Sequence, residues 1–338
     1  MRDFSQNSID LNGKGILVTG GTGSFGRRFI RTVLDRFDPK RVVIYSRDEL
    51  KQFEMEQELP VSKHRSLRYF IGDVRDRDRL RMAMRGIDIV IHAAALKHVP
   101  AAEYNPTECI HTNVMGAENV IHAAIESGVD KVLALSTDKA ANPINLYGAS
   151  KLAADKLFIA GNSLSATEGT RFAVVRYGNV VGSRGSVVPL FKKLVANGEA
   201  ELPITDERMT RFWITLQQGV DFVLSSIGPM GGGEIFVPKI PSMKIIDLAR
   251  CMAPSRKHEI VGIRPGEKLH EVMITEDDGR ATRELPDRYV IEPQSLMLED
   301  VSKLWMEFPR VEEGFRYASD NNPEWLDEKA MTKLLDEV

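Results

Sequence analysis

The sequence predicts an α/β fold in which a parallel sheet, covered by helices on both faces, is followed by a smaller C-terminal lobe. In the first half, short runs rich in Val, Ile and Leu alternate with stretches of helical pattern. Such runs are typical of parallel strands buried on both faces. After about Tyr177 the pattern loosens and prolines punctuate the chain. The 338 residues, 43% hydrophobic and 28% charged, exclude a disordered chain, a collagen and a coiled coil.

Six strands are predicted in chain order, at residues 15–19, 41–45, 67–71, 87–91, 131–135 and 172–176. A Gly-rich turn and a helical stretch over residues 26–37 follow the first of them. Alternation of buried strands with helices favours crossovers between parallel neighbours. Ligands of such open sheets bind outside the carboxyl ends of the strands. We therefore expect the functional residues at that edge.

Composition and charge exclude several classes of partner. The formal net charge is −3, so there is no basic excess to favour nucleic acid. Two cysteines, Cys109 and Cys251, cannot form a disulfide framework, which favours a reducing cytoplasm. Apolar stretches such as 87–95 are too short to cross a bilayer, and the polar start lacks the apolar run of a signal peptide. We expect a cytoplasmic protein without membrane insertion.

The turn after the first strand reads GGTGSFG and opens a helix. It is a G-x-x-G-x-x-G variant of the dinucleotide fingerprint, in which glycines let the backbone approach a pyrophosphate at a helix N-terminus. The strand, turn and helix context predicts a Rossmann-type cofactor site. Its expected residues are Gly20, Thr22, Gly23, Ser24, Phe25 and Gly26.

The second strand ends at Ser46 and Arg47, where an NAD site usually offers a carboxylate. A hydroxyl and a guanidinium suit a 2′-phosphate better, so we expect NADP. The alternative is a solvated Arg47, with Asp48 or Glu49 turned toward the ribose.

Two further strand ends add candidates for cofactor binding. Asp73 could accept from an adenine amino group while Val74 packs on the ring, although Asp73 could also cap the next helix. Ala93 and Ala94 are small enough for a cofactor to lie close. Lys97 could meet cofactor or sugar oxygens, or could be a solvated loop charge.

Chemistry-bearing residues cluster after the fifth strand. Thr137 lies just after it, and Tyr147 and Lys151 follow at a spacing that places both on one helical face. The charge of Lys151, like that of an oxidised nicotinamide, favours the phenolate of Tyr147. Tyr147 can then take a proton from a sugar hydroxyl that is oxidised, while Thr137 hydrogen-bonds the same oxygen. Lys151 and Tyr147 therefore belong to both the cofactor and the catalytic sets.

These motifs resemble the extended short-chain dehydrogenase/reductases, and most closely their inverting 4,6-dehydratases, which act on UDP-N-acetylglucosamine in pseudaminic acid biosynthesis. The resemblance extends from about Lys14 to Pro293. Its narrowest signals are the triplet Thr137-Asp138-Lys139 and the run IRPGEKLHE that ends at Glu271. The resemblance implies an NADP-dependent lyase that oxidises C4, eliminates water across C5 and C6, inverts C5 and reduces C6.

Such a dehydratase needs an acid/base pair beyond the tyrosine, lysine and hydroxyl set. Retaining dehydratases show Asp-Glu where this chain has Asp138-Lys139, and the resemblance implies a lysine base for the inverting class. We expect Lys139 to take the C5 proton and Asp138 to protonate the leaving hydroxyl. Lys139 must then be partly desolvated, or near another cation, to be neutral. The alternative is a plain ion pair at a helix start.

The resemblance also implies a substrate site and an assembly. Expected substrate contacts are Lys97, Asn179, Arg184, Arg208, Arg264 and Glu267. We expect a dinucleotide-binding domain over residues 1–178, and over 179–338 a substrate lobe with segments returning to the first domain and a helical tail. A homo-oligomer, dimer or hexamer, is implied, and no metal is expected.

Three other functions, in two classes, stay open at this point. A UDP-sugar 4-epimerase, or a C5-retaining 4,6-dehydratase, would use much of the same site. A different class is a catalytically idle protein that senses NADP, against which the complete Thr137, Tyr147 and Lys151 set argues.

Overall fold

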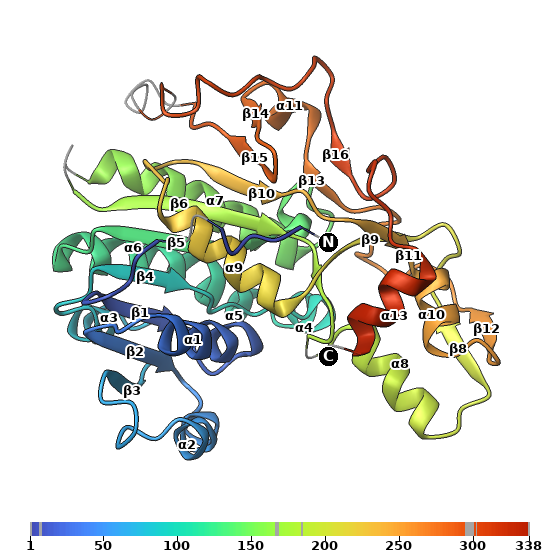
Figure 1. Ribbon diagram of the computed structural model, residues 1–338, viewed down its shortest axis with the longest axis horizontal. Coiled ribbons are helices and arrows are strands. Elements are labelled where there is room, and N and C mark those ends of the chain that lie inside the picture. The colour runs from blue at the N-terminus through green and yellow to red at the C-terminus, as the bar shows by residue number, and fades with distance from the viewer. Residues whose placement is uncertain are drawn as a thin grey trace.

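The computed structural model describes residues 2–6, 9–165, 169–183, 185–294, 301 and 303–336. A nine-stranded sheet runs through it, in the order β14-β15-β10-β6-β5-β4-β1-β2-β3 (Figure 1). The strands are β1 Gly15–Thr19, β2 Arg41–Ser46, β3 Leu67–Ile71, β4 Ile89–His92, β5 Lys131–Thr137, β6 Arg171–Tyr177, β10 Ile235–Pro238, β14 Thr282–Glu284 and β15 Arg288–Ile291. Neighbours from β3 to β10 are parallel, and β15 and β14 are antiparallel. The predicted parallel sheet is confirmed, and three strands from the C-terminal half extend it.

The register of the sheet places the carboxyl ends of its parallel strands at one edge. Every residue of β1 and β4 is buried, because helices cover both faces. Thr19 at the end of β1 pairs with His92 at the end of β4, and Thr137 at the end of β5 pairs with Tyr177 of β6. The loops that follow β1, β4 and β5 therefore leave the sheet at one edge.

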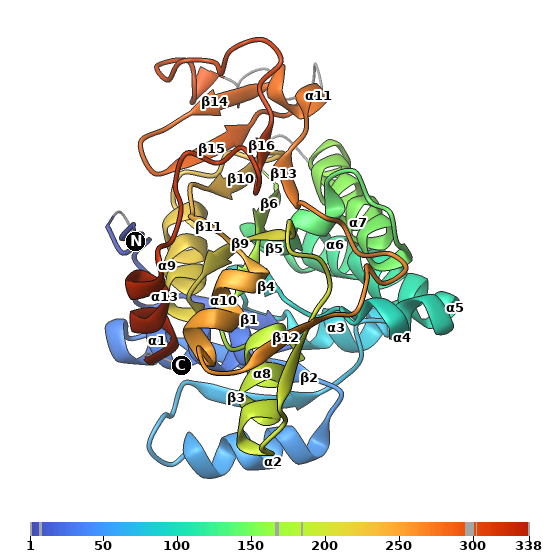
Figure 2. The same cartoon turned by 90° about the vertical axis from the view of Figure 1, so that its right-hand side faces the viewer.

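Helices pack on the two faces of the sheet (Figures 1 and 2). On one face lie α1 Ser24–Arg36 and α9 Leu216–Ile227, joined by an ion pair of 2.7 Å between Arg36 and Asp221. On the other lie α3 Arg77–Ala83, α6 Gly116–Ser127 and α7 Leu146–Leu164. Helix α9 comes from the C-terminal half of the chain, so that half completes the cover of the sheet.

Shorter elements precede the main helices of the second face. Helices α4 Val99–Tyr104 and α5 Pro106–Ile110 lead through a π-helix, His111–Met115, into α6. A 3₁₀ turn, Asp138–Ala140, follows β5 directly. Helix α2 Glu49–Glu58 lies beside β3 at the edge of the sheet.

A small lobe projects from the carboxyl edge of the sheet and has a core of its own, which includes Val188, Phe191, Trp213, Leu248 and Met331. It contains α8 Val187–Ala196, α10 Ile245–Met252, α13 Glu328–Asp336 and the strands β7 Asn179–Val180, β8 Glu201–Ile204, β9 Thr210–Ile214, β11 Ser242–Lys244 and β12 Lys257–Ile260. Strand β13 Val272–Ile274 pairs with β16 Tyr317–Ala318, and α11 Glu276–Gly279 follows β13.

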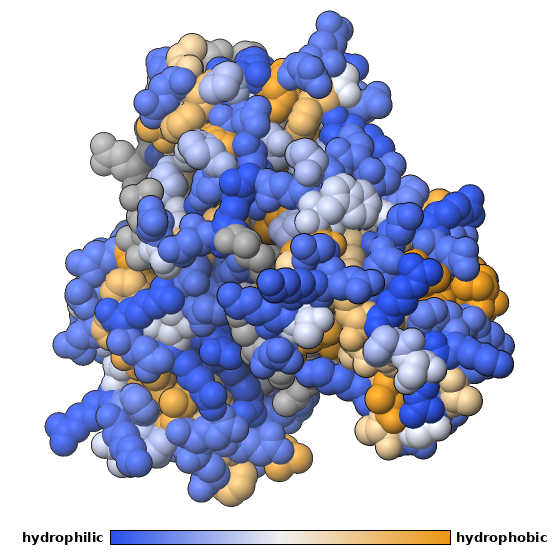
Figure 3. Space-filling view, turned by 45° about the vertical axis from the view of Figure 1, so that its right-hand side comes forward, coloured by the Kyte–Doolittle hydropathy of each residue, from blue (hydrophilic) through white to orange (hydrophobic). Residues whose placement is uncertain are grey.

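The surface of this lobe carries exposed apolar side chains (Figure 3). Leu190, Ile260, Val261 and Ile263 are among them. In the described part of the chain, none of the helices combines the length and the apolar character needed to span a bilayer.

Candidate active site

A cleft of about 670 Å³ lies at the carboxyl edge of the sheet, beneath the small lobe. It brings together every residue predicted for the cofactor and for catalysis. They are Gly20, Thr22, Gly23, Ser24, Phe25, Gly26, Ser46, Arg47, Asp73, Val74, Ala93, Ala94, Lys97, Thr137, Asp138, Lys139, Tyr147 and Lys151.

The glycine turn brings backbone, rather than side chains, to the cleft. Gly20 has a φ of +65°, a region that L side chains rarely adopt, and a Cβ there would lie 2.9 Å from the Ala94 nitrogen. A Cβ at Gly26 would lie 2.5 Å from the Cα of Gly21. No side chain of the described residues caps α1 at Gly23, and its first turn has no acidic residue. Its first N–H groups are thus available to an anion, as a pyrophosphate requires.

The end of β2 offers hydroxyl and guanidinium groups to the cleft. The Ser46 Oγ lies 2.8 Å from the Thr22 Oγ1, and the Arg47 side chain is half exposed, 3.6 Å from the Asp73 carboxylate. Asp48 accepts a hydrogen bond from the Lys51 backbone N–H at 3.0 Å as the N-cap of α2. Capping of α2 therefore engages Asp48, one of the two carboxylates that the alternative interpretation turned toward the ribose.

Asp73 and Val74 lie on the same wall of the cleft. Arg75 donates to the Asp73 carboxylate from its backbone N–H and its guanidinium, which lowers the pKa of Asp73 against its burial. Asp76, not Asp73, caps the following helix α3. The alternative role considered for Asp73, a helix cap, is thus wrong. Val74 is buried beside it.

His92, at the end of β4, is buried next to Ala93 and Ala94, which line the cleft. Its Nδ1 lies 2.9 Å from the Thr19 Oγ1, which also accepts from the backbone N–H groups of both alanines. Burial lowers the pKa of His92 to about 3, so the ring is neutral. The residue packs and orients backbone at this point.

The turn after β5 positions the acid/base candidates. The Thr137 hydroxyl donates to Asp138 Oδ1 at 2.9 Å and accepts from the Lys139 backbone N–H at 3.4 Å, which caps the 3₁₀ turn. Asp138 is almost completely buried, and its Oδ2 has no hydrogen-bond partner among the described residues. Burial raises the pKa of Asp138 and so favours its protonated form, against the nearby charge of Lys139.

Tyr147 and Lys151 lie one turn apart in α7, as the spacing predicts. Asn145 accepts from the Gly148 N–H at 2.7 Å and so fixes the start of that helix above the turn after β5. The Lys151 Nζ donates to the Leu135 carbonyl oxygen at 2.7 Å. Burial raises the pKa of Tyr147 to about 12, against the charge of Lys139 and a hydrogen bond with Thr137. Within the protein, Lys139 is thus the cation that most favours the phenolate.

Lys139 extends from the turn after β5 into an acidic environment. Its Nζ lies 3.0 Å from Asp138 Oδ1 and 3.0 Å from Glu271 Oε1. The side chain is 26% exposed and lines the cleft. The two carboxylates outweigh burial and raise the pKa of Lys139 above its ordinary value. The expectation of a lysine made neutral by desolvation is therefore wrong for this arrangement, and the ion pair of the alternative interpretation is present.

Glu271 is the residue of this cluster that the sequence analysis did not identify. It immediately precedes β13, and it lies 3.6 Å from the Arg211 Nε and 4.0 Å from the Lys268 Nζ. The run that ends at Glu271 is a narrow motif of the sequence, but only Arg264 and Glu267 within it are predicted there as substrate contacts. Contact with Lys139 depends on how the lobe packs, which no local pattern shows.

The predicted substrate residues are only partly brought to the cleft. Lys97 and Asn179 line it. Arg208 instead pairs with Asp206 at 2.8 Å and is largely exposed, while Arg264 lies 3.8 Å from Glu267 on an exposed loop. These three, Arg208, Arg264 and Glu267, are not in the cleft lining, and Arg184 lies outside the described residues.

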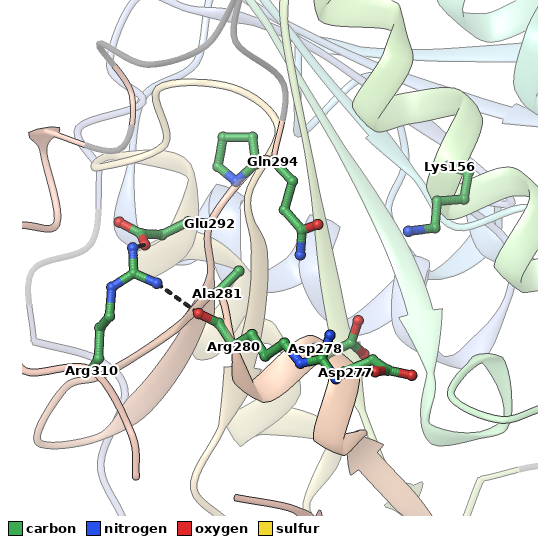
Figure 4. A pocket seen from close by; sticks show the side chains of 9 residues that line it. Lys156, Asp277, Asp278, Arg280, Ala281, Glu292, Gln294 and Arg310 are labelled. Carbon is green, nitrogen blue, oxygen red and sulfur yellow. Dashed lines mark hydrogen bonds and ion pairs between the residues drawn. The ribbon is translucent and has the colours of Figure 1, made fainter. Parts of the chain in front are cut away.

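A second cavity, of about 470 Å³, lies between α7 and the segment that carries α11 and β14 (Figure 4). Charged side chains make up most of its walls, and several of them form ion pairs. Glu292 lies 3.1 Å from the Arg310 Nη2 and 3.2 Å from the Arg283 Nε. None of the predicted site residues lines it.

The chain is similar over most of its length to enzymes that act on UDP-sugars. Residues 16–293 match the family model described as polysaccharide biosynthesis protein. An inverting UDP-N-acetylglucosamine 4,6-dehydratase from Campylobacter jejuni is 58% identical over 330 residues, which cover 96% of this chain and 98% of that protein. A UDP-glucose 4-epimerase from Rickettsia canadensis is 44% identical over 289 residues, 82% of each chain. The predicted resemblance to the inverting dehydratases is confirmed.

Solved structures agree with the fold. Pen from Bacillus thuringiensis has a TM-score of 0.87 and 36% identity, with 98% of this chain and 100% of that one covered. DesIV from Streptomyces venezuelae, a dTDP-glucose 4,6-dehydratase solved with NAD bound, has a TM-score of 0.66 and 23% identity, with 86% and 97% covered. The predicted Rossmann-type α/β fold is confirmed.

Proposed function

The chain belongs to the polysaccharide biosynthesis protein family, and from that premise we propose that it is an inverting UDP-N-acetylglucosamine 4,6-dehydratase. It is a lyase that oxidises C4 of the hexose, eliminates water across C5 and C6, inverts C5 and reduces C6. The observation that carries the proposal is the joint presence in one cleft of an oxidation set, Thr137, Tyr147 and Lys151, and a separate acid/base pair, Asp138 and Lys139.

The cleft suits a nicotinamide dinucleotide. The exposed backbone of the glycine turn and the uncapped start of α1 can hold the pyrophosphate. When bound there, such a cofactor would supply the hydride acceptor for oxidation at C4 and the hydride donor for reduction at C6. Ser46 and Arg47 support NADP over NAD, because they would donate to a 2′-phosphate while Asp48 is engaged in capping α2.

Oxidation at C4 is assigned to residues at the end of β5 and in the first turns of α7. Tyr147 takes the proton from the C4 hydroxyl, and the Thr137 hydroxyl turns from Asp138 Oδ1 to donate to the same oxygen. Burial alone would keep Tyr147 protonated, so the cations of the site must favour the phenolate. Among the protein's cations, Lys139 supplies most of that positive charge. The Lys151 Nζ is fixed at the base of the cleft by its hydrogen bond to the Leu135 carbonyl oxygen.

Elimination follows because the C4 ketone makes the C5 hydrogen acidic. Neutral Lys139 takes that proton, the electron pair of the C5–H bond forms the C5–C6 double bond, and the C6–O bond breaks. Asp138 gives its proton to the leaving hydroxyl, which departs as water. A proton moved across the 3.0 Å contact from Lys139 to Asp138 creates both reactive forms at once. Lys139 then returns a proton to the other face of C5, which inverts it.

Substrate recognition is assigned to residues around the mouth of the cleft. We propose that the lobe after residue 178 binds the UDP moiety, with Lys97 and Asn179 in place and Arg184, Arg208, Arg264 and Glu267 as further contacts. Arg208, Arg264 and Glu267 reach a ligand in the cleft only if their loops move toward it. We also propose that the chain forms a homo-oligomer, which sedimentation of the purified chain tests. We propose further that it acts in the cytoplasm.

Proton NMR of UDP-N-acetylglucosamine incubated with the protein and NADP in deuterated water tests the function. We expect a 4-keto-6-deoxy product, deuterium at C5 and the L-arabino configuration that inversion produces. A C4 epimer without loss of water would establish a 4-epimerase, to which the 44% identity with the Rickettsia enzymes points. An uninverted C5 would establish a retaining dehydratase, and unchanged sugar would favour an NADP sensor.

A further inference from the structure

Glu271 is buried at the contact between the small lobe and the turn after β5, with 1% of its surface exposed. Its backbone is fixed on both sides by Ser319, since the Glu271 N–H donates to the Ser319 Oγ at 2.9 Å and the Ser319 N–H donates to the Glu271 oxygen at 2.8 Å. Its position is therefore set by the pairing of β13 with β16, independently of the cleft.

Two cations hold the Glu271 carboxylate from the lobe side. Arg211 donates to the backbone oxygens of Thr210, Leu269 and Lys268 and is rigid for that reason. The Lys268 Nζ donates to the Ala141 oxygen at 2.5 Å, on the segment that carries Lys139. These cations and Lys139 lower the pKa of Glu271, so the group is ionised at neutral pH.

The remaining contact of Glu271 is to the proposed base. Its Oε1 lies 3.0 Å from the Lys139 Nζ, and its Oε2 is buried without a hydrogen-bond partner among the described residues. A carboxylate used only for stability gains little from such burial, because desolvation offsets the attraction. Here the paired amine lines the cleft, so the contact fixes where that amine lies.

We propose that Glu271 is a positioning residue for the elimination step: it holds the Lys139 amine at the wall of the cleft, and its negative charge sets the pH range in which the Asp138–Lys139 pair keeps a single proton. The inference rests on the proposed function and deepens it.

The negative charge of Glu271 shifts the protonation of the Asp138–Lys139 pair in one direction. The reactive pair, protonated Asp138 with neutral Lys139, carries one proton, as does the resting ion pair. Activity therefore requires a pH between the two protonation steps of the pair. The anion of Glu271 favours the protonated form of both partners and moves both steps to higher pH. The charged or titratable groups that face Lys139 are Asp138, Glu271, Arg211, Lys268 and Tyr147.

The test compares Glu271→Gln with wild type in the full-length protein, with UDP-N-acetylglucosamine and NADP. The rate of deuterium entry at C5, plotted against pH, should rise along an acid limb and fall along an alkaline limb. We expect both limbs to move to lower pH by about one unit or more in Glu271→Gln. The maximal kcat should fall by up to about 100-fold because the amine is less well placed. The KM for UDP-N-acetylglucosamine should change less than about twofold, because Glu271 is not a proposed contact of the UDP moiety.

Two further variants separate charge from position and cover a failure of Glu271→Gln to fold. Glu271→Asp keeps the negative charge but moves the carboxylate away from the Lys139 amine, because the side chain is one methylene shorter. The kcat should therefore fall while both limbs stay near their wild-type pH. Lys268→Met removes a cation near Glu271, so both limbs should move to higher pH, opposite to Glu271→Gln.

Glu292→Gln is the matched control. Glu292 is also a buried glutamate held by two cations, and it lies in the second cavity beside Arg310 (Figure 4). Its substitution should lower the melting temperature and leave both limbs unmoved. If Glu271→Gln gave the same result, Glu271 would be a structural ion pair and the inference would be overturned.

A direct titration keeps this test separate from that of the function. NMR of ¹³C-lysine-labelled protein without substrate reports the pKa of Lys139, which should fall in Glu271→Gln and stay unchanged in Glu292→Gln. If wild type does not release water from the sugar, the proposed function fails. If wild type dehydrates but neither the titration nor the limbs respond to Glu271→Gln, only the role of Glu271 fails.

Discussion

Substitution of Lys139 by alanine removes the ammonium that lies 3.0 Å from each of two carboxylates, those of Asp138 and Glu271. Loss of a general base lowers the rate of the catalysed step by about 10²- to 10⁴-fold. Oxidation at C4 should slow less, because Lys139 acts on it only through the pKa of Tyr147. Reduced nicotinamide should therefore accumulate together with the 4-keto sugar.

The same substitution leaves two buried carboxylates without their shared cation. Removal of one partner of a buried pair costs about 3–5 kcal/mol of folding free energy. The lower end of that range applies, because Arg211 and Lys268 still face Glu271 and the raised pKa of Asp138 lets it take up a proton. The variant should remain folded, which calorimetry can check.

The assay is a single turnover of UDP-N-acetylglucosamine, followed by the absorbance of reduced nicotinamide and by NMR of the sugar. Lys156→Ala is the control, because Lys156 is an exposed lysine of α7 outside the cleft. A folded Lys139→Ala protein that released the 4-keto-6-deoxy product at the wild-type rate would refute the reasoning.

Other substitutions test the remaining parts of the site. Asp138→Asn should leave oxidation at C4 intact and slow the loss of water by about 10²- to 10⁴-fold, as measured by NMR of the sugar, and equal slowing of both steps would argue against an acid role. Arg47→Ala should weaken NADP binding by roughly 10- to 100-fold and leave NAD binding unchanged in titration calorimetry, whereas equal losses would argue against 2′-phosphate recognition. Gly26→Ala should destabilise the chain by about 1–3 kcal/mol in thermal unfolding, because its Cβ would lie 2.5 Å from the Gly21 Cα; unchanged stability would contradict the tight packing. The pKa of Glu271 is lowered in the folded chain, so its charge stabilises the fold above its unfolded pKa of about 4.3, and that contribution is lost as the pH falls through the folded value. Urea unfolding of Glu271→Gln should therefore show a shallower loss of stability toward acid pH than wild type, and parallel curves would contradict it.

Local sequence was sufficient for the cofactor half of the site. The glycine turn, Ser46 and Arg47 follow strands whose apolar runs mark them, and parallel strands bring their carboxyl ends to one edge. Tyr147 and Lys151 share a helix face at a spacing that the chain states directly. The bounds of these elements shift by at most two residues: β4, for example, begins at Ile89 rather than Ile87, and β5 ends at Thr137 rather than Leu135.

The substrate half could not be obtained in the same way. Arg208 and Arg264 were expected as contacts for a diphosphate because they are cations near narrow motifs, but each has an acidic neighbour two or three residues away. In the structure those local pairs form at the surface. A charge in a loop does not reveal from sequence alone whether it faces a ligand or its own neighbour.

The amino-acid sequence by itself determined the parallel sheet, the glycine turn and the succession Thr137, Asp138, Lys139, Tyr147 and Lys151, because strand period, turn chemistry and helix pitch act over a few residues. Only the tertiary structure decided which charged groups surround Lys139. The packing of β13 against β16 brings Glu271 to within 3.0 Å of an amine far away along the chain, and α9 returns to cover the sheet. Electrostatic energy depends on distance in space and on burial, and neither can be read from order along the chain.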